Sequence, residues 1–255
     1  MSIFKQVIKI IKLIRPKHIS NCVISPGHTI KTVKYHYRRV PERNFIEFIA
    51  QKWGYSIEEV DSAYTHYNSN YRMWEDIKAK LSIYPNNYAS QMTMELPSLY
   101  LLVKLLKPNC IIETGVASGA SSAYILQALH ENGKGQLHSI DLPPDNLPEG
   151  KMSGWVVPSH LKNQWSLHIG DSKDLLEPVL ANLGQVDCFL HDSLHTYDHM
   201  IWEFRTVWNY LIRGGLFLSH DVGANDAFFD FMKEKSIPWK DYRVFHVLGG
   251  LRKIS

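Results

Sequence analysis

The chain has 255 residues, of which 45 % are apolar and 21 % are charged. These values are typical of a soluble globular protein, and the length allows one elaborated domain or a domain plus a small one. No apolar run reaches the ~18 residues of a membrane span. Its three cysteines, Cys22, Cys110 and Cys188, lack the spacing of a metal site, so we expect reduced thiols in a cytoplasmic protein.

The formal net charge of +3 is unevenly distributed. Residues 1–41 contain nine Lys or Arg residues and no Asp or Glu, which leaves 19 basic residues against all 25 acidic ones. A basic arm therefore precedes an acidic body, and this pattern predicts an anionic surface as partner, possible membrane contact included, with no nucleic acid expected. Lys5, Lys9 and Lys12 interrupt the first apolar stretch, which argues against a signal peptide.

Within this arm, residues 2–15 are predicted to form a basic amphipathic helix. Phe4, Ile8 and Ile11 follow helical spacing, with lysines elsewhere around the helix. Two interpretations stay open: the helix lies on an anionic membrane, or it docks on its own domain or on a second subunit. We also expect a homo-oligomer.

Four further helices are predicted before the first strand, at 42–53, 56–64, 70–81 and 96–106. Ser56 and Glu59 have the spacing of a capping box. Aromatic residues are dense in this part of the chain, and they either line a substrate pocket or pack in the core: Tyr64, Tyr67, Tyr71 and Trp74. We assign residues 1–90 to a basic arm and helical cap and 91–255 to the main domain.

From residue 110 onward, strands and helices alternate. Strands are predicted at 110–112, 136–140, 165–169, 186–191 and 216–219, and helices at 121–130, 172–181, 195–212 and 226–235. This alternation predicts an α/β fold, a doubly wound, mostly parallel seven-stranded sheet with helices on both faces. Segments 242–248 and 251–254 flank Gly249 and Gly250, which we interpret as the two-residue turn of a C-terminal antiparallel hairpin.

A small-residue turn follows the first predicted strand. The strand ends at Glu113, and the turn runs through Gly115, Val116, Ala117, Ser118 and Gly119 into a helix. Strand, tight glycine turn and helix bring backbone N–H groups close to a ligand. Ala117 stands where a dinucleotide fingerprint would have its second glycine. An acid at the strand end favours a ligand with an ammonium group over a pyrophosphate.

Acidic residues recur at the carboxyl ends of the predicted strands. In chain order they are Glu113, Asp141, Asp171, Asp192 and Asp221, the last preceded by His220. Ligands of parallel sheets bind at this edge. A single acid there is explained equally well as a helix cap, and Asp171 or Ser172 fits that role. Five such strand ends in series indicate a ligand site.

With these motifs the sequence resembles the class I S-adenosylmethionine-dependent methyltransferases over residues 95–255. The segment from Glu113 to Gly119 matches their first motif, and Asp141 matches the acid that binds the ribose hydroxyls. Asp171 and Ser172 match the pair beside the adenine. The resemblance implies a Rossmann-like methyltransferase fold and these cofactor-binding residues: Glu113, Gly115, Val116, Ala117, Ser118, Gly119, Asp141, Asp171 and Ser172.

A narrower resemblance covers residues 189–197 and 218–222, which are similar to metal-dependent O-methyltransferases of the catechol and macrolide-sugar type. It implies a divalent cation, Mg²⁺ or Mn²⁺, held by Asp192, His220 and Asp221. His220 stands where an acid is usual, and histidine suits Mn²⁺ better than Mg²⁺. The implied catalytic residues are His195, as the general base, and Asp192. The implied acceptor is a hydroxyl group of a small molecule or sugar.

Two other functions are weighed against this one. The first is a nicotinamide-dependent dehydrogenase built on the same sheet, against which Ala117 and the terminal hairpin count. The second is a non-catalytic methyltransferase-like protein that binds a membrane or nucleic acid through its basic arm. The proline-rich segment 142–160 is either a mobile flap over the ligand, with Trp155 as its apolar contact, or a surface loop.

Overall fold

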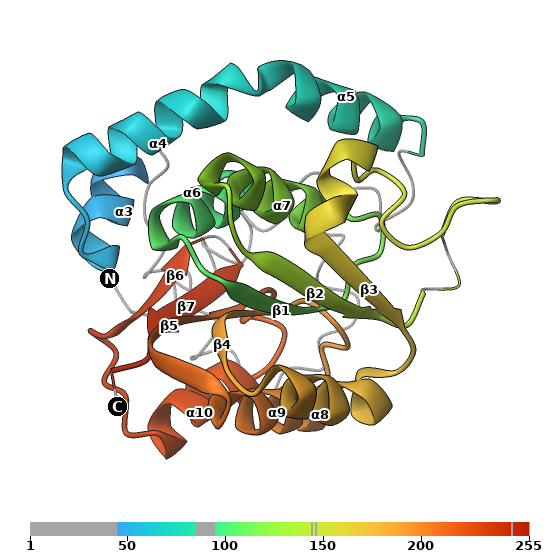
Figure 1. Ribbon diagram of the computed structural model, residues 1–255. Helices are drawn as coiled ribbons and strands as arrows, with labels where there is room; N and C mark the ends of the chain where they lie inside the picture. Colours follow the sequence, from blue (N-terminus) through green and yellow to red (C-terminus); the bar gives the residue numbers. More distant parts are fainter. Residues whose placement is uncertain (1–44, 85–94, 144, 146, 246, 255) are drawn as a thin grey trace, which may run out of the picture. The chain divides into compact units, whose positions relative to one another are not determined.

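The computed structural model describes residues 45–84, 95–143, 145, 147–245 and 247–254. Within these residues, seven strands form one sheet in the order β3-β2-β1-β4-β5-β7-β6 (Figure 1). The strands are β1 (Cys110–Thr114), β2 (Gln136–Asp141), β3 (Trp165–Ile169), β4 (Val186–His191), β5 (Leu211–Ser219), β6 (Tyr242–Phe245) and β7 (Leu248–Arg252). Strands β1 to β5 pair in parallel, whereas β7 pairs antiparallel with β5 and β6. The predicted arm and its helix lie outside the described residues.

Helices cover both faces of the sheet (Figure 1). On one face lie α3 (Phe45–Trp53), α4 (Ile57–Ser69), α5 (Tyr71–Ser82), α6 (Leu96–Leu106) and α7 (Ala120–Asn132). On the other lie α8 (Ser172–Leu183), α9 (Tyr197–Trp208) and α10 (Ala227–Glu234). A short 3-10 helix, η4 (Ser159–Gln164), leads into β3. The predicted doubly wound α/β fold is confirmed, and no helix in the described part is both long and apolar enough to span a bilayer.

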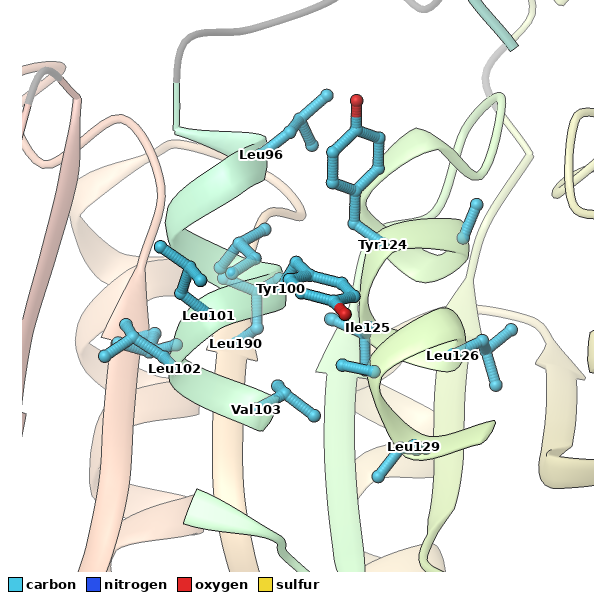
Figure 2. Packing of buried hydrophobic residues seen from close by; sticks show 14 of the residues in the cluster. Leu96, Tyr100, Leu101, Leu102, Val103, Tyr124, Ile125, Leu126, Leu129 and Leu190 are labelled. Atoms are coloured by element: carbon cyan, nitrogen blue, oxygen red, sulfur yellow. The ribbon is translucent and has the colours of Figure 1, made fainter. Parts of the chain in front are cut away.

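Local sequence explains how several of these helices form and pack. The predicted capping box begins α4: the Ser56 hydroxyl accepts from the backbone N–H of Glu59, whose carboxylate accepts from that of Ser56. Helix α6 is buried along most of its length because its residues are almost all apolar. Figure 2 shows the ring of Tyr100 on α6 packed toward Ile125 on α7.

The aromatic residues of the helical cap pack in the core. Tyr67 stacks on Trp74 with ring centroids 5.4 Å apart, and Trp74 stacks on Tyr124 of α7 at 4.1 Å. Trp74 is 6 % exposed, whereas Tyr71 is 57 % exposed and lies at the surface. Of the two interpretations left open by the sequence, core packing is therefore the one that the structure shows.

The predicted helix 195–212 was too long at both ends. Helix α9 ends at Trp208, and β5 begins at Leu211, which pairs with Val186 of β4. Residues 211 and 212 continue the helical spacing of apolar side chains, but pairing with β4 determines their conformation. Gly214 and Gly215 lie inside β5, next to a register shift in β4 between Val186 and Cys188.

The C-terminal hairpin is present, but its predicted turn was wrong. Gly249 and Gly250 lie inside β7, which pairs with both β5 and β6. A Cβ on Gly249 would lie 2.7 Å from Val222 Cγ1, and one on Gly250 would lie 2.6 Å from Leu218 Cδ2. These glycines therefore allow the strand to approach its neighbours closely, and they do not form a turn.

Candidate functional site

The predicted small-residue turn directly follows β1. Gly115, Ala117 and Gly119 have positive φ angles of 85°, 47° and 88°. A Cβ on Gly115 would clash with the backbone oxygen of Asp192, and one on Gly119 would lie 2.6 Å from Gly154 Cα. Both glycines are thus required for conformation and for close approach.

Glu113 lies beneath this turn and is fully buried. Its carboxylate accepts hydrogen bonds from the hydroxyls of Ser121, Ser122 and Ser139, at 2.7, 2.7 and 2.6 Å. Burial raises the pKa of Glu113 to about 7, although these hydroxyls oppose the rise. In this position Glu113 joins α7 to β1 and β2, and its oxygens are not exposed to a ligand.

Asp141 at the end of β2 is 4 % exposed and holds the turn from the other side. Its Oδ1 accepts from the Val116 N–H at 2.8 Å, and its Oδ2 accepts from the Ser153 hydroxyl. Ser153 belongs to segment 142–160, whose next residue, Gly154, donates its N–H to the Ala117 carbonyl at 2.9 Å. Part of this segment, which the sequence left open as a flap or a surface loop, is therefore packed on the turn.

The side chains of Asp171 and Ser172, which follow β3, point in different directions. Asp171 caps α8 by accepting from the Lys173 N–H at 2.9 Å, which is the alternative role that the sequence left open. Ser172 points inward and donates its hydroxyl to Glu203 Oε1 at 2.7 Å. Of these two residues, Asp171 is exposed and Ser172 is buried.

The ends of β4 and β5 bring Asp192, His195, His220 and Asp221 together. One ligand atom from each of Asp192, His195 and His220 lies within 4.8 Å of the others. Asp192 Oδ1 is 3.0 Å from His220 Nδ1 and 3.6 Å from His195 Nε2. Asp221 Oδ2 is 3.6 Å from His220 Nδ1. The cluster follows from the parallel pairing of β4 with β5, which places both strand ends side by side.

Backbone strain accompanies this cluster. Asp221 has a φ of 47°, a left-handed conformation that few residues other than glycine adopt. Its side chain is 42 % exposed, so the carboxylate is accessible. Strained residues of this kind concentrate at functional sites.

The surroundings of His195 and His220 shift their pKa values in opposite directions. Burial lowers the pKa of His195, although Asp192 opposes the shift. Burial also acts to lower the pKa of His220, but the carboxylate of Asp192 and the hydrogen bond to Glu95 raise it to about 11. Burial alone would raise the pKa of Asp192, and the charge on His220 lowers it. His195 is thus the neutral member of the pair at pH 7.

Comparison with known proteins fits this geometry. Residues 112–222, which hold the turn after β1 and the cluster at β4 and β5, match the family model described as a methyltransferase domain. The match covers less than half of the chain, and it shows that this part is similar to methyltransferase domains. A search of curated proteins found no match to the sequence.

Solved structures of other proteins share the fold of this chain. One is the S-adenosylhomocysteine-bound methyltransferase PaMTH1 of Podospora anserina, with 13 % identity and a TM-score of 0.54 over 72 % of this chain and 88 % of that chain. Another is an O-methyltransferase from Bacillus cereus in complex with S-adenosylhomocysteine, with 12 % identity and a TM-score of 0.54 over 71 % and 91 %. At this level of identity the likeness concerns the fold.

Two buried acids in the described part of the chain were missed by sequence reasoning. Glu95, directly before α6, is 2 % exposed, and its Oε1 lies 2.5 Å from His220 Nε2. Glu203 on α9 is fully buried and contacts five side chains: Thr114, Ser172, His191, Ser193 and His199. Glu203 lies at helical spacing from Met200 on the buried face of α9, and an acid at such a position is a signal that the sequence offered. Glu95 offered none.

Proposed function

We propose that this chain transfers a methyl group from S-adenosylmethionine to a hydroxyl of a small molecule or sugar. One observation supports this most: a tight glycine turn and a cluster of acids and histidines lie at one edge of a sheet with the strand order given above. The two related structures were determined with S-adenosylhomocysteine, the product of methyl transfer. A nicotinamide-dependent dehydrogenase and a non-catalytic binding protein have no comparable support.

The proposed donor site is formed by residues 115–119, Asp141, Asp171 and Ser172. The turn presents backbone N–H groups and the beginning of α7 to the ligand. For Asp141 to bind ribose hydroxyls, its Oδ2 must accept them alongside the Ser153 hydroxyl or in its place. Glu113 acts through the turn, since its oxygens are occupied by three serines.

The sulfonium methyl group is already activated, so the main task of the protein is to align the acceptor oxygen with it. Positioning of this kind contributes ~7–11 kcal/mol in well-oriented reactions. Leu194 and Tyr197 are 58 % and 42 % exposed next to the cluster, and they offer apolar surface to the carbon skeleton of an acceptor. His195 then takes the proton of the hydroxyl.

The residues present fit a divalent metal ion. His220 Nδ1 is buried and has no hydrogen bond from any described residue, although Asp192 Oδ1 lies 3.0 Å away. Two ligands of one ion stand about 3 Å apart at ordinary bond lengths. Asp192, His220 and Asp221 would hold the ion, which when bound would lower the pKa of the acceptor hydroxyl. An imidazole ligand favours Mn²⁺ over Mg²⁺.

We further propose a cytoplasmic location for the protein and a binding role for its basic arm. Cys110 and Cys188 are free thiols in the described part of the chain, as is usual in the cytoplasm. For the basic arm we propose contact with an anionic membrane surface, and docking on a second copy of the chain is the alternative.

Calorimetry tests the proposed function. S-adenosylhomocysteine should bind the full-length chain, and Asp141→Ala should weaken binding by ~1–3 kcal/mol, because hydrogen bonds to a charged group are lost. Asp174→Ala, an exposed acid in the first turn of α8, is the control and should bind normally. Binding of NADH without binding of S-adenosylhomocysteine would contradict the proposal. Label transfer from methyl-labelled donor to a hydroxyl compound separates an enzyme from a non-catalytic binder.

A further inference from the structure

The carboxylate of Glu95 is buried at a place where a charge is costly. Glu95 occupies the N-cap position of α6, yet its side chain makes no capping hydrogen bond with any described residue. Its carboxylate instead meets the His220 ring, 125 positions further along the chain, with 2.5 Å between Oε1 and Nε2. A buried acid that does not cap its helix is expected to serve the group that it contacts.

The two nitrogens of the His220 ring face different surroundings. Nε2 faces Glu95, whereas Nδ1 faces the cluster, 3.0 Å from Asp192 Oδ1 and 3.6 Å from Asp221 Oδ2. The 2.5 Å between Glu95 Oε1 and His220 Nε2 is hydrogen-bond distance, and a carboxylate oxygen in such a contact accepts from the ring N–H, which places a proton on Nε2. A neutral imidazole has one N–H, and its other nitrogen then presents a lone pair.

We propose that Glu95 is a positioning residue that holds His220 with its proton on Nε2, so that Nδ1 is directed at a metal ion shared with Asp192. This inference rests on the metal ion of the proposed function. In many metal sites, a histidine ligand donates its other ring N–H to a carboxylate. This outer carboxylate fixes the tautomer and the orientation of the ring.

The position of Glu95 in the fold explains why it can orient His220. Glu95 begins α6, which packs on α7 over the sheet (Figure 2), while His220 follows β5. The His220 N–H is bonded to the His191 carbonyl at 2.7 Å, which fixes the backbone of the histidine. Glu95 fixes its ring from the opposite side of the cluster. The ring is thereby held at two points before any ion binds.

The types of ligand atom in the cluster indicate which divalent ions would bind there. The His220 ring lies between the carboxylate of Glu95 on one side and those of Asp192 and Asp221 on the other. Nδ1 of His220 and the Asp192 carboxylate would hold a divalent ion, whose binding requires an unprotonated nitrogen. An imidazole nitrogen with carboxylate oxygens suits Mn²⁺, Co²⁺ or Zn²⁺ better than Mg²⁺.

Calorimetric titration of the full-length chain with Mn²⁺ tests the inference. Glu95→Leu should weaken Mn²⁺ affinity about 10–100-fold, as is typical when an outer partner is lost. Glu95→Gln keeps an oxygen that accepts from Nε2, so its loss should be smaller. Glu58→Gln, an exposed acid in the first turn of α4, should bind Mn²⁺ normally. S-adenosylhomocysteine affinity should be unchanged in all three variants.

A second readout is independent of affinity. In the Zn²⁺-loaded chain, long-range ¹⁵N–¹H NMR should show the His220 proton on Nε2. A proton on Nδ1, or equal Mn²⁺ affinity in every variant that stays folded by circular dichroism, would overturn the inference. If the unaltered chain binds S-adenosylhomocysteine but none of Mn²⁺, Co²⁺ and Zn²⁺, this inference fails and methyl transfer stands. If it binds metal but no S-adenosylhomocysteine, the proposed function fails instead.

Discussion

The proposed proton transfer depends on the ring of His195. Its Nε2 is buried, has no hydrogen-bond partner within the described ranges, and lies 3.6 Å from Asp192 Oδ1. His191 meets it edge to face, with ring centroids 5.3 Å apart. A base must be neutral in order to accept a proton, and burial favours the neutral ring. The residue is therefore prepared for this role before the acceptor arrives.

His195→Ala should lower kcat by ~10²–10⁴, which is typical for loss of a general base. The Kd for S-adenosylhomocysteine, measured by calorimetry, should stay nearly the same, because the proposed site has His195 beside the acceptor and not beside the donor. His160→Ala replaces an exposed histidine before β3 and serves as the control. Equal kcat values for His195→Ala and His160→Ala would show that His195 is not the general base.

The pH dependence of kcat follows from the same ring. Because burial lowers the pKa of His195 below its usual value, the ring stays neutral above about pH 6.5. The rate should therefore be level from about pH 6.5 to 8 and fall only as the pH drops below that range. If kcat already falls as the pH drops from a value above 7, a group other than His195 acts as the base.

At the scale of elements, Glu203 joins the loops that carry the site. Its oxygens accept from Thr114 at the end of β1, Ser172 at the start of α8 and Ser193 after β4. Burial would raise the pKa of Glu203, but hydrogen bonds from His191 and His199 hold it well below its usual range. The ionised carboxylate thus connects the proposed adenine side of the edge to the loop of Asp192 and His195.

Glu203→Leu should destabilise the fold by ~3–5 kcal/mol, because it leaves buried donors without their acceptor. Glu203→Gln should cost less, since its amide oxygen accepts some of these bonds. Urea unfolding measures both free energies, with Glu177→Gln on the exposed face of α8 expected within ~0.5 kcal/mol of the unaltered chain. A Leu variant as stable as the Gln variant would show that the network contributes little.

At the scale of the whole molecule, the basic arm of residues 1–41 predicts binding to anionic membranes, and this binding can be measured. If the arm contacts an anionic membrane, replacing Lys5, Lys9 and Lys12 with Gln in the full-length chain should reduce vesicle binding. Binding of the unaltered chain should require anionic lipid and fall with added salt, because screening weakens attraction at the surface. Equal sedimentation of both chains with anionic vesicles would favour docking of the arm on protein.

The sequence by itself predicted the α/β alternation, the glycine turn and the strand ends that carry Asp141, Asp192 and Asp221. These features are encoded locally, in hydrophobic period, turn chemistry and capping spacing. Helix α6 was predicted with its observed bounds, because its apolar run ends where Pro108 prevents continuation. The resemblance to methyltransferases supplied the proposed roles of these residues.

Only the tertiary structure decided which side chains meet across the sheet. Glu95 and His220 are 125 residues apart, and Glu203 gathers partners from β1, β4 and α8. Gly249 and Gly250 were interpreted as a turn because their sequence fits one, yet Val222 and Leu218 beside them require a strand without side chains. Local patterns specify what a segment can form, whereas close packing and buried polar contacts depend on which segments become neighbours in space.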